Sequence, residues 1–112
     1  MIRPLALILG LVMALPAAAH DLRVFASVSG DMVTVESKFS TGRVPKDGTV
    51  RVMDAENAVL MTLPVGEAGE TVFALPEGTA ETGLMIEVEV SEGHSDYWLL
   101  TPEDIAHGLE MN

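Results

Sequence analysis

From residue 20 onward, apolar and polar side chains alternate in short, valine-rich segments that are divided by Gly, Pro, Asp and Asn. A period of two residues is typical of β-strands that bury one face, whereas an amphipathic helix repeats about every 3.6 residues. The pattern therefore predicts an all-β domain and argues against a helical bundle.

Seven of these segments are predicted to be strands. They cover residues 21–29, 32–40, 49–54, 59–65, 70–75, 84–90 and 97–100. Short strands that turn about every 8 to 12 residues are typical of β-sandwiches. We therefore expect one domain over residues 20–112, an immunoglobulin-like or carboxypeptidase-regulatory-like sandwich of about seven strands.

The first two segments are joined by Gly30-Asp31, a pair suited to a two-residue type II′ turn. Such a turn fixes which residues face each other across the hairpin. The predicted partners are Val28 with Val33, Ala26 with Val35, and Leu22 with Phe39. Ser37, opposite Val24, is the polar exception on the apolar face.

The end of the chain is predicted to contain a turn, a strand and a short helix. Residues 92–96, which include His94, are expected to form the turn before the strand at 97–100. Thr101, Pro102 and two acidic residues then predict a helix, with Thr101 as its N-cap, that ends near Gly108.

Residues 1–19 have the order of a secretory signal peptide. Arg3 is their only charge, residues 5–15 are apolar, and small residues lead up to Ala19. The apolar stretch is too short to cross a bilayer, so we expect no membrane span after the leader is removed. Cleavage after Ala19 would make His20 the first residue of a periplasmic protein.

Charge and composition narrow the functional classes. The sequence has 17 acidic and 6 basic side chains, and removal of the leader takes only Arg3, which leaves a net charge of −12. Clusters of Lys and Arg are not evident, so we expect no binding to nucleic acid or to an anionic membrane surface. The sequence also lacks cysteine, so a bound metal must be held by nitrogen, oxygen or thioether ligands. No catalytic motif is present, and we expect no enzymatic activity.

The histidines provide the strongest functional signal. At a new N-terminus, His20 would offer its α-amine and its imidazole as a chelate for Ni(II), Cu(II) or Co(II). If the first six strands alternate in direction, His94 lies at the same end of the sandwich as His20. Glu92 and Asp96 flank His94 and would add carboxylate oxygens, which completes a ligand set that suits Ni(II) or Cu(II).

The same alternation brings Asp47 and Glu67 to this end of the sandwich. The third histidine, His107, lies near the end of the predicted helix, where an imidazolium complements the helix dipole. We therefore expect His107 to cap the helix and not to bind a metal. The methionines form no Met-x-Met cluster of the kind that suits Cu(I).

A series of short motifs runs through the chain. The predicted mature N-terminus is His-Asp-Leu-Arg-Val-Phe-Ala (20–26), and Val-Glu-Ser-Lys-Phe-Ser (35–40) follows the Gly-Asp hairpin. A Gly-Arg-Val-Pro-Lys loop (42–46), a strand that ends in an Asp turn (52–54), and Gly93-His94 before Tyr97-Trp98 complete the series. In this order the motifs resemble the small periplasmic accessory components of energy-coupling-factor nickel and cobalt transporters.

The resemblance implies a secreted β-sandwich that captures Ni(II) or Co(II) or presents the ion to a membrane transporter. It also implies that His20 and His94 are ligands. Two alternatives stay open from the residues themselves. One is a copper-binding periplasmic sandwich with an N-terminal histidine, because Cu(II) binds such ligands more tightly than Ni(II). The other is an acidic protein-interaction module that binds no metal.

Overall fold

The computed structural model describes residues 21–90 and 93–110. Within these residues, seven strands precede a C-terminal helix. In chain order the elements are β1 (Leu22–Ser29), β2 (Met32–Phe39), β3 (Gly48–Met53), β4 (Val59–Pro64), the short 3₁₀ turn η2 (Glu67–Gly69), β5 (Glu70–Ala74), β6 (Leu84–Val90), β7 (His94–Leu100) and α2 (Pro102–Glu110).

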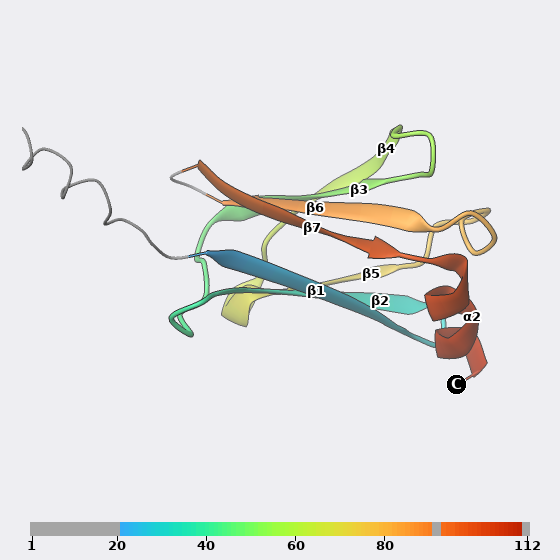
Figure 1. Ribbon diagram of the computed structural model, residues 1–112, viewed down its shortest axis with the longest axis horizontal. Coiled ribbons are helices and arrows are strands. Elements are labelled where there is room, and N and C mark those ends of the chain that lie inside the picture. Colours follow the sequence, from blue (N-terminus) through green and yellow to red (C-terminus); the bar gives the residue numbers. More distant parts are fainter. Residues whose placement is uncertain (1–20, 91–92, 111–112) are drawn as a thin grey trace, which may run out of the picture.

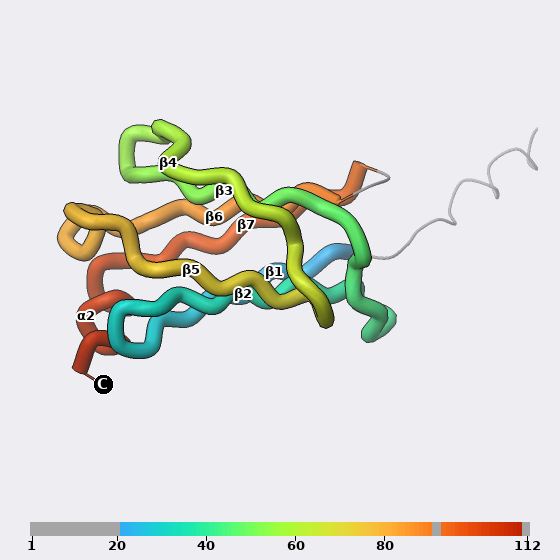
Figure 2. Tube along the Cα trace, turned by 180° about the vertical axis from the view of Figure 1, so that it is seen from behind, coloured from blue at the N-terminus to red at the C-terminus, as the bar shows by residue number. Residues whose placement is uncertain are grey.

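The strands form two facing sheets (Figure 1). One sheet has the order β1-β2-β5 and the other has the order β4-β3-β6-β7. Every pair of neighbouring strands is antiparallel. This arrangement confirms the predicted all-β sandwich, and the view from behind shows the two layers and α2 at one end (Figure 2).

The predicted register of the first hairpin is confirmed. Val28 faces Val33, Ala26 faces Val35, Val24 faces Ser37 and Leu22 faces Phe39. The first residue of the connecting turn, Gly30, has a φ of +63°, as a type II′ turn requires at that position. The turn and the period of two therefore act together, because a slip of one residue would expose every apolar side chain.

The core lies between the sheets and consists mostly of β-branched side chains. The residues with no exposed surface are Val33, Val35, Val50, Val52, Ile86, Val88 and Ile105. Ser37 is also buried, with 2% of its surface exposed, and its Oγ has no hydrogen-bond partner among the described residues. Ser37 is therefore a buried polar residue on β2, the middle strand of the β1-β2-β5 sheet, and its hydroxyl has no hydrogen bond within the described residues.

Helix α2 closes the end of the sandwich opposite the start of β1 (Figure 1). Its N-terminus has a reciprocal cap: Asp104 N donates to Thr101 Oγ1, and Thr101 N donates to Asp104 Oδ2, both at 3.1 Å. Thr101 is therefore the N-cap, as predicted. The helix ends at Glu110, slightly beyond the predicted end near Gly108.

Gly108 brings α2 into direct contact with the first hairpin. Gly30 N donates to Gly108 O at 3.0 Å, and a Cβ at Gly108 would collide with the backbone carbonyl of Val28. A side chain at this position would push the helix away from β1. The close approach therefore requires glycine.

One boundary prediction is wrong. His94, Ser95 and Asp96 were expected in a turn, but they form the first half of β7 and pair with Val90, Glu89 and Val88. His94 and Asp96 are half-buried and Ser95 is exposed, so the period of two continues through polar residues. His94 and Asp96 occupy inward positions of β7, which is an edge strand of its sheet, and both side chains stay partly exposed to solvent.

The predicted signal peptide, His20 and Glu92 lie outside the described residues. Within residues 21–90 and 93–110, no helix has both the length and the apolar character needed to cross a membrane.

Candidate functional site

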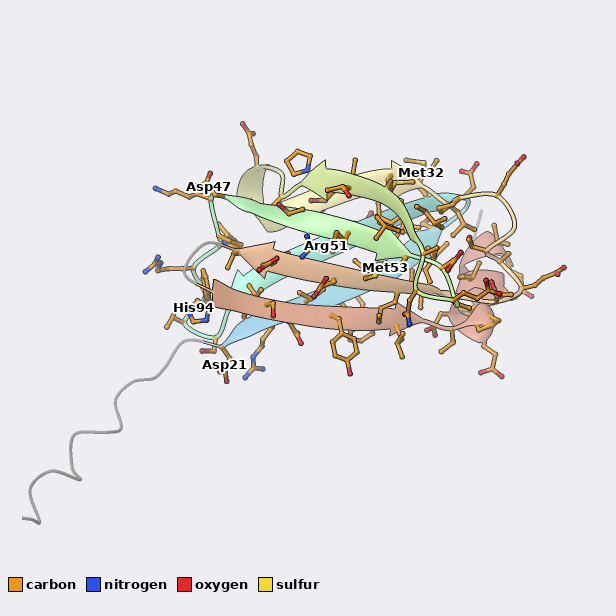
Figure 3. The ribbon with its side chains drawn as sticks, turned by 90° about the horizontal axis from the view of Figure 1, so that it is seen from above. Asp21, Met32, Asp47, Arg51, Met53 and His94 are labelled. Atoms are coloured by element: carbon orange, nitrogen blue, oxygen red, sulfur yellow. The ribbon has the colours of Figure 1, made fainter. Side chains whose placement is uncertain are left out.

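One end of the sandwich brings together most of the residues that the sequence singled out. Asp21, Asp47 and His94 lie at this end, away from α2 (Figure 3). Asp21 directly precedes β1, Asp47 precedes β3, and His94 begins β7. The predicted alternation of strand directions is therefore correct, and it places His94 beside the start of β1.

His94 joins the two sheets at this end. It pairs with Val90, the last residue of β6, while its ring packs against Phe39, the last residue of β2. The ring centroids are 5.6 Å apart and the ring planes meet at 80°, an edge-to-face contact. This contact fixes the direction of a half-buried imidazole that is still partly open to solvent.

Asp96 has a structural partner. Its Oδ2 accepts a hydrogen bond from Val24 N at 3.1 Å. This N–H points away from β2, because in an antiparallel pair alternate residues direct their polar groups outward. The carboxylate thus satisfies an exposed donor on the edge strand β1 and connects that strand to β7. A metal at this end would have to share Asp96 with this hydrogen bond.

A shallow hollow joins His94 to the beginning of the described chain. It is lined by Asp21, Leu22, Arg23, Val24, Gly93, His94, Ser95 and Asp96. The structure thus brings His94 and Asp96 together next to the residue that follows His20. Within residues 21–90 and 93–110, no group of three or more His, Asp or Glu side chains is placed to hold a metal. A metal bound by His94 would therefore need ligands from residues outside the described ranges. His20 and Glu92 are the predicted ligands there.

Asp47 and Glu67 have other surroundings. Neither lines the hollow that contains His94. Asp47 lines a second hollow at the same end, together with Phe39 and Arg43, and Glu67 begins the turn η2. The strand alternation placed both acids at the correct end, but it carries no information about distances within that end.

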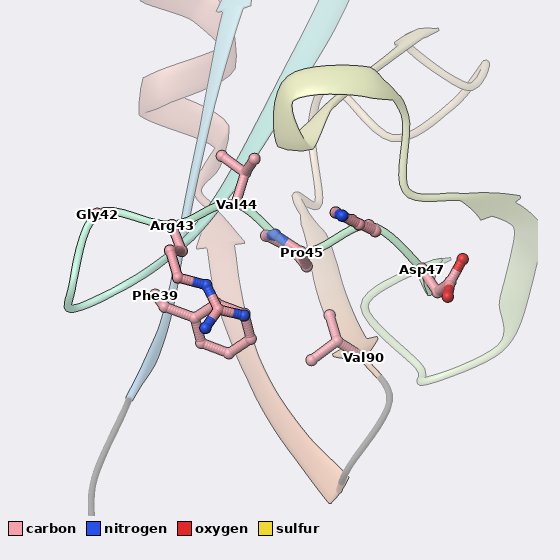
Figure 4. Close-up of a pocket in the computed structure, with 8 residues that line it drawn as sticks. Phe39, Gly42, Arg43, Val44, Pro45, Asp47 and Val90 are labelled. Atoms are coloured by element: carbon pink, nitrogen blue, oxygen red, sulfur yellow. The ribbon is translucent and has the colours of Figure 1, made fainter.

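The second hollow, of about 680 Å³, was not predicted from the sequence (Figure 4). Its lining includes Phe39, Arg43, Lys46, Asp47 and Val90. The Arg43 guanidinium carbon lies over the Phe39 ring, 5.9 Å from the centroid, which is a cation–π contact. The sequence feature that could have indicated this hollow is Phe39, near the end of a predicted strand, followed four positions later by Arg43.

The basic side chains are unevenly distributed along the sandwich. Arg23 and Lys38 face each other across the first hairpin, and Arg43 and Lys46 lie in the loop that follows β2. All four lie toward the end that holds His94.

Arg51, the remaining basic side chain of the described residues, is neutralised locally. Its Nε donates to Glu87 at 3.1 Å and its Nη2 donates to Glu89. These hydrogen bonds, that to Glu89 foremost, raise the pKa of Arg51 above its ordinary value. The guanidinium therefore stays charged and compensates two glutamates on the outer face of the β4-β3-β6-β7 sheet.

Comparison with known proteins adds no family assignment. No protein-family model matches this chain, and no curated protein has a significant sequence match to it.

Proposed function

We propose that this protein is a periplasmic, non-enzymatic metal-binding protein that assists a membrane transporter in the uptake of Ni(II) or Co(II). The observation that carries the proposal is the position of His94, which shares one hollow with Asp21, the residue after His20. In this proposal, removal of the leader exposes the His20 α-amine and imidazole, and His94 supplies a third nitrogen. Such nitrogen-rich sites suit Ni(II), Co(II) and Cu(II).

Two further features support this proposal. The Phe39 contact holds the His94 ring, so a ligand at this position is already oriented before the ion arrives. The net charge of −12 that remains after removal of the leader attracts divalent cations in general, although it does not define a site. Asp96 and Glu92 are the proposed carboxylate ligands, and Asp96 would use the oxygen that Val24 does not engage.

The first experiment is a titration of the exported protein with Ni(II), Co(II) and Cu(II), after mass spectrometry has shown that the chain begins at His20. We compare it with a protein that carries one extra alanine before His20 and with His94→Phe, which keeps an aromatic ring against Phe39. The extra alanine separates the α-amine from the His20 imidazole, and His94→Phe removes one imidazole, so the Ni(II) affinity should fall at least about tenfold in each. His107→Gln, on α2 at the opposite end, is the matched control and should bind as the wild type does.

Equal affinity in the wild type, the extended protein and His94→Phe would contradict the site and favour an interaction module without metal. A chain that begins at another residue would contradict the N-terminal chelate. Cu(II) is expected to bind most tightly in any case. Nickel accumulation by cells that carry the wild type or His94→Phe therefore decides between nickel uptake and copper binding.

The pH dependence provides a second check on the N-terminal chelate. A free α-amine has a pKa of about 8 and must lose its proton to bind a metal. Affinity should therefore rise as the pH increases from about 6 to about 8. The extended protein, which lacks the paired amine and imidazole, should show a weaker rise.

A further inference from the structure

The hollow beside Phe39 has the features of a binding site for an anion. Its loop is held by two backbone hydrogen bonds: Phe39 N donates to Arg43 O, and Gly42 N donates to Phe39 O, both at 2.8 Å. These bonds fold the loop back on the end of β2 and place Arg43 over the Phe39 ring (Figure 4). The guanidinium is thus positioned by backbone and ring together.

Arg43 keeps its hydrogen-bond donors available. In the part of the chain that the structure describes, Arg51 is the only basic side chain that forms ion pairs. Arg43 therefore has no carboxylate partner there, although the sequence contains 17 acidic residues. A planar guanidinium that is already oriented loses little freedom when it binds a carboxylate with two parallel hydrogen bonds.

The other walls define the class of ligand. Lys46 adds a second positive charge and Asp47 one negative charge, while Val44, Pro45 and Val90 are apolar. The local charge is therefore positive on an acidic protein. A small organic acid, which has a carbon skeleton beside its carboxylate, fits this mixture better than fully hydrated inorganic phosphate.

We propose that this hollow binds the carboxylate of a small organic acid. Phe39 forms one wall of the hollow and also contacts the His94 ring, so the bound acid would lie next to the proposed metal site. If the proposed function holds, the incoming ion is therefore accepted as its carboxylate complex, with Arg43 binding the acid and His94 binding the metal. The carboxylate site itself does not depend on the metal.

The test uses the exported protein, freed of metal, in calorimetric titrations with citrate, succinate and inorganic phosphate. Arg43→Gln should weaken citrate binding about tenfold or more, because it removes a bidentate charged contact. Lys38→Gln is the matched control. It removes the same charge from an exposed position on β2 outside both hollows, so it should change the affinity less than about twofold.

Arg43→Lys provides a second variant that keeps the charge and loses the planar, paired donors. It should also bind citrate less tightly than the wild type. Equal losses in Arg43→Gln and Lys38→Gln would show that only the general field attracts citrate, and this would overturn the site. Phosphate binding as tight as citrate binding would overturn the ligand class.

A last comparison separates this inference from the proposed function. Arg43→Gln should lower the affinity for preformed Ni(II)–citrate and leave the affinity for Ni(II) in a non-coordinating buffer unchanged. A wild-type protein that binds citrate but no Ni(II) would contradict the proposed function and leave the carboxylate site intact. A protein that binds Ni(II), with citrate binding unaffected by Arg43→Gln, would overturn the carboxylate site alone.

Discussion

Ser37 combines deep burial with an unsatisfied hydroxyl. It faces Val24 across the hairpin, and its Oγ has no partner within the described residues. A buried polar group without a hydrogen bond costs free energy, which replacement by an apolar group of similar size removes. Ser37→Ala should therefore increase the free energy of unfolding by about 1 kcal/mol.

Urea denaturation measures this difference, and Ser27→Ala serves as the control. Ser27 is exposed on β1, so its replacement should change the free energy of unfolding by less than about 0.5 kcal/mol. A loss of stability in Ser37→Ala would mean that the hydroxyl is satisfied in solution, for example by a buried water molecule.

Asp96 has two proposed roles that mutation can separate. Asp96→Asn keeps an oxygen that can accept from Val24 N, whereas Asp96→Ala leaves this amide without its acceptor. We expect Asp96→Ala to lower the free energy of unfolding by about 2 kcal/mol and Asp96→Asn to lower it much less. Hydrogen exchange at Val24 should be accelerated only in Asp96→Ala.

Metal binding provides the complementary measurement for Asp96. If the carboxylate also binds the ion, Asp96→Asn should weaken Ni(II) binding although the free energy of unfolding changes little. Unchanged Ni(II) affinity would leave Asp96 with the structural role alone.

Among the elements, α2 makes the most specific contact through Gly108. Helix propensity alone predicts that Gly108→Ala stabilises the protein by about 1 kcal/mol. The close approach to Val28 predicts the opposite sign, because the added methyl group would meet the carbonyl of β1. We expect a loss of about 1–3 kcal/mol in the free energy of unfolding, as for other overpacked sites.

Thermal or urea denaturation decides the sign for Gly108→Ala. Faster hydrogen exchange at Gly30 N, which donates to Gly108 O, would show that the helix has separated from the hairpin. A more stable Gly108→Ala would show that the contact is loose enough to accommodate a methyl group.

Local elements were predicted better than contacts between them. The β1–β2 register could be predicted because a two-residue turn and a strict period of two leave one arrangement that buries the valines. The start of β7 could not be predicted, because His94 and Asp96 are polar. The residues that they contact, Phe39 and Val24, belong to the other sheet.

The candidate site was predicted in part for the same reason. Strand alternation placed His94, Asp47 and Glu67 at one end, but no sequence period encodes which of them share a hollow. The contact of Arg43 with Phe39 depends on how one loop folds back on its strand, and such contacts are not periodic in sequence.

At the scale of the whole molecule, acidic charge dominates. The net charge is −11, and Glu36 and Glu70 face each other directly across β2 and β5. Directly opposed like charges destabilise a sheet, and salt screens the repulsion. The melting temperature should therefore rise when NaCl is raised from about 0.01 M to about 0.5 M.

Glu70→Lys tests the origin of this effect, because it places opposite charges across the same pair. It should raise the melting temperature at low salt by about 2–4 °C and reduce the gain from added NaCl. A salt response that is identical in the wild type and Glu70→Lys would show that this pair contributes nothing to the repulsion.

The two ends of the chain depend on each other at the outer edge of β1. The outer edge of the first strand is covered by Asp96 and Gly108, which belong to the last strand and the last helix. A chain that lacked this segment would leave Val24 N without its acceptor and β1 as an open edge strand.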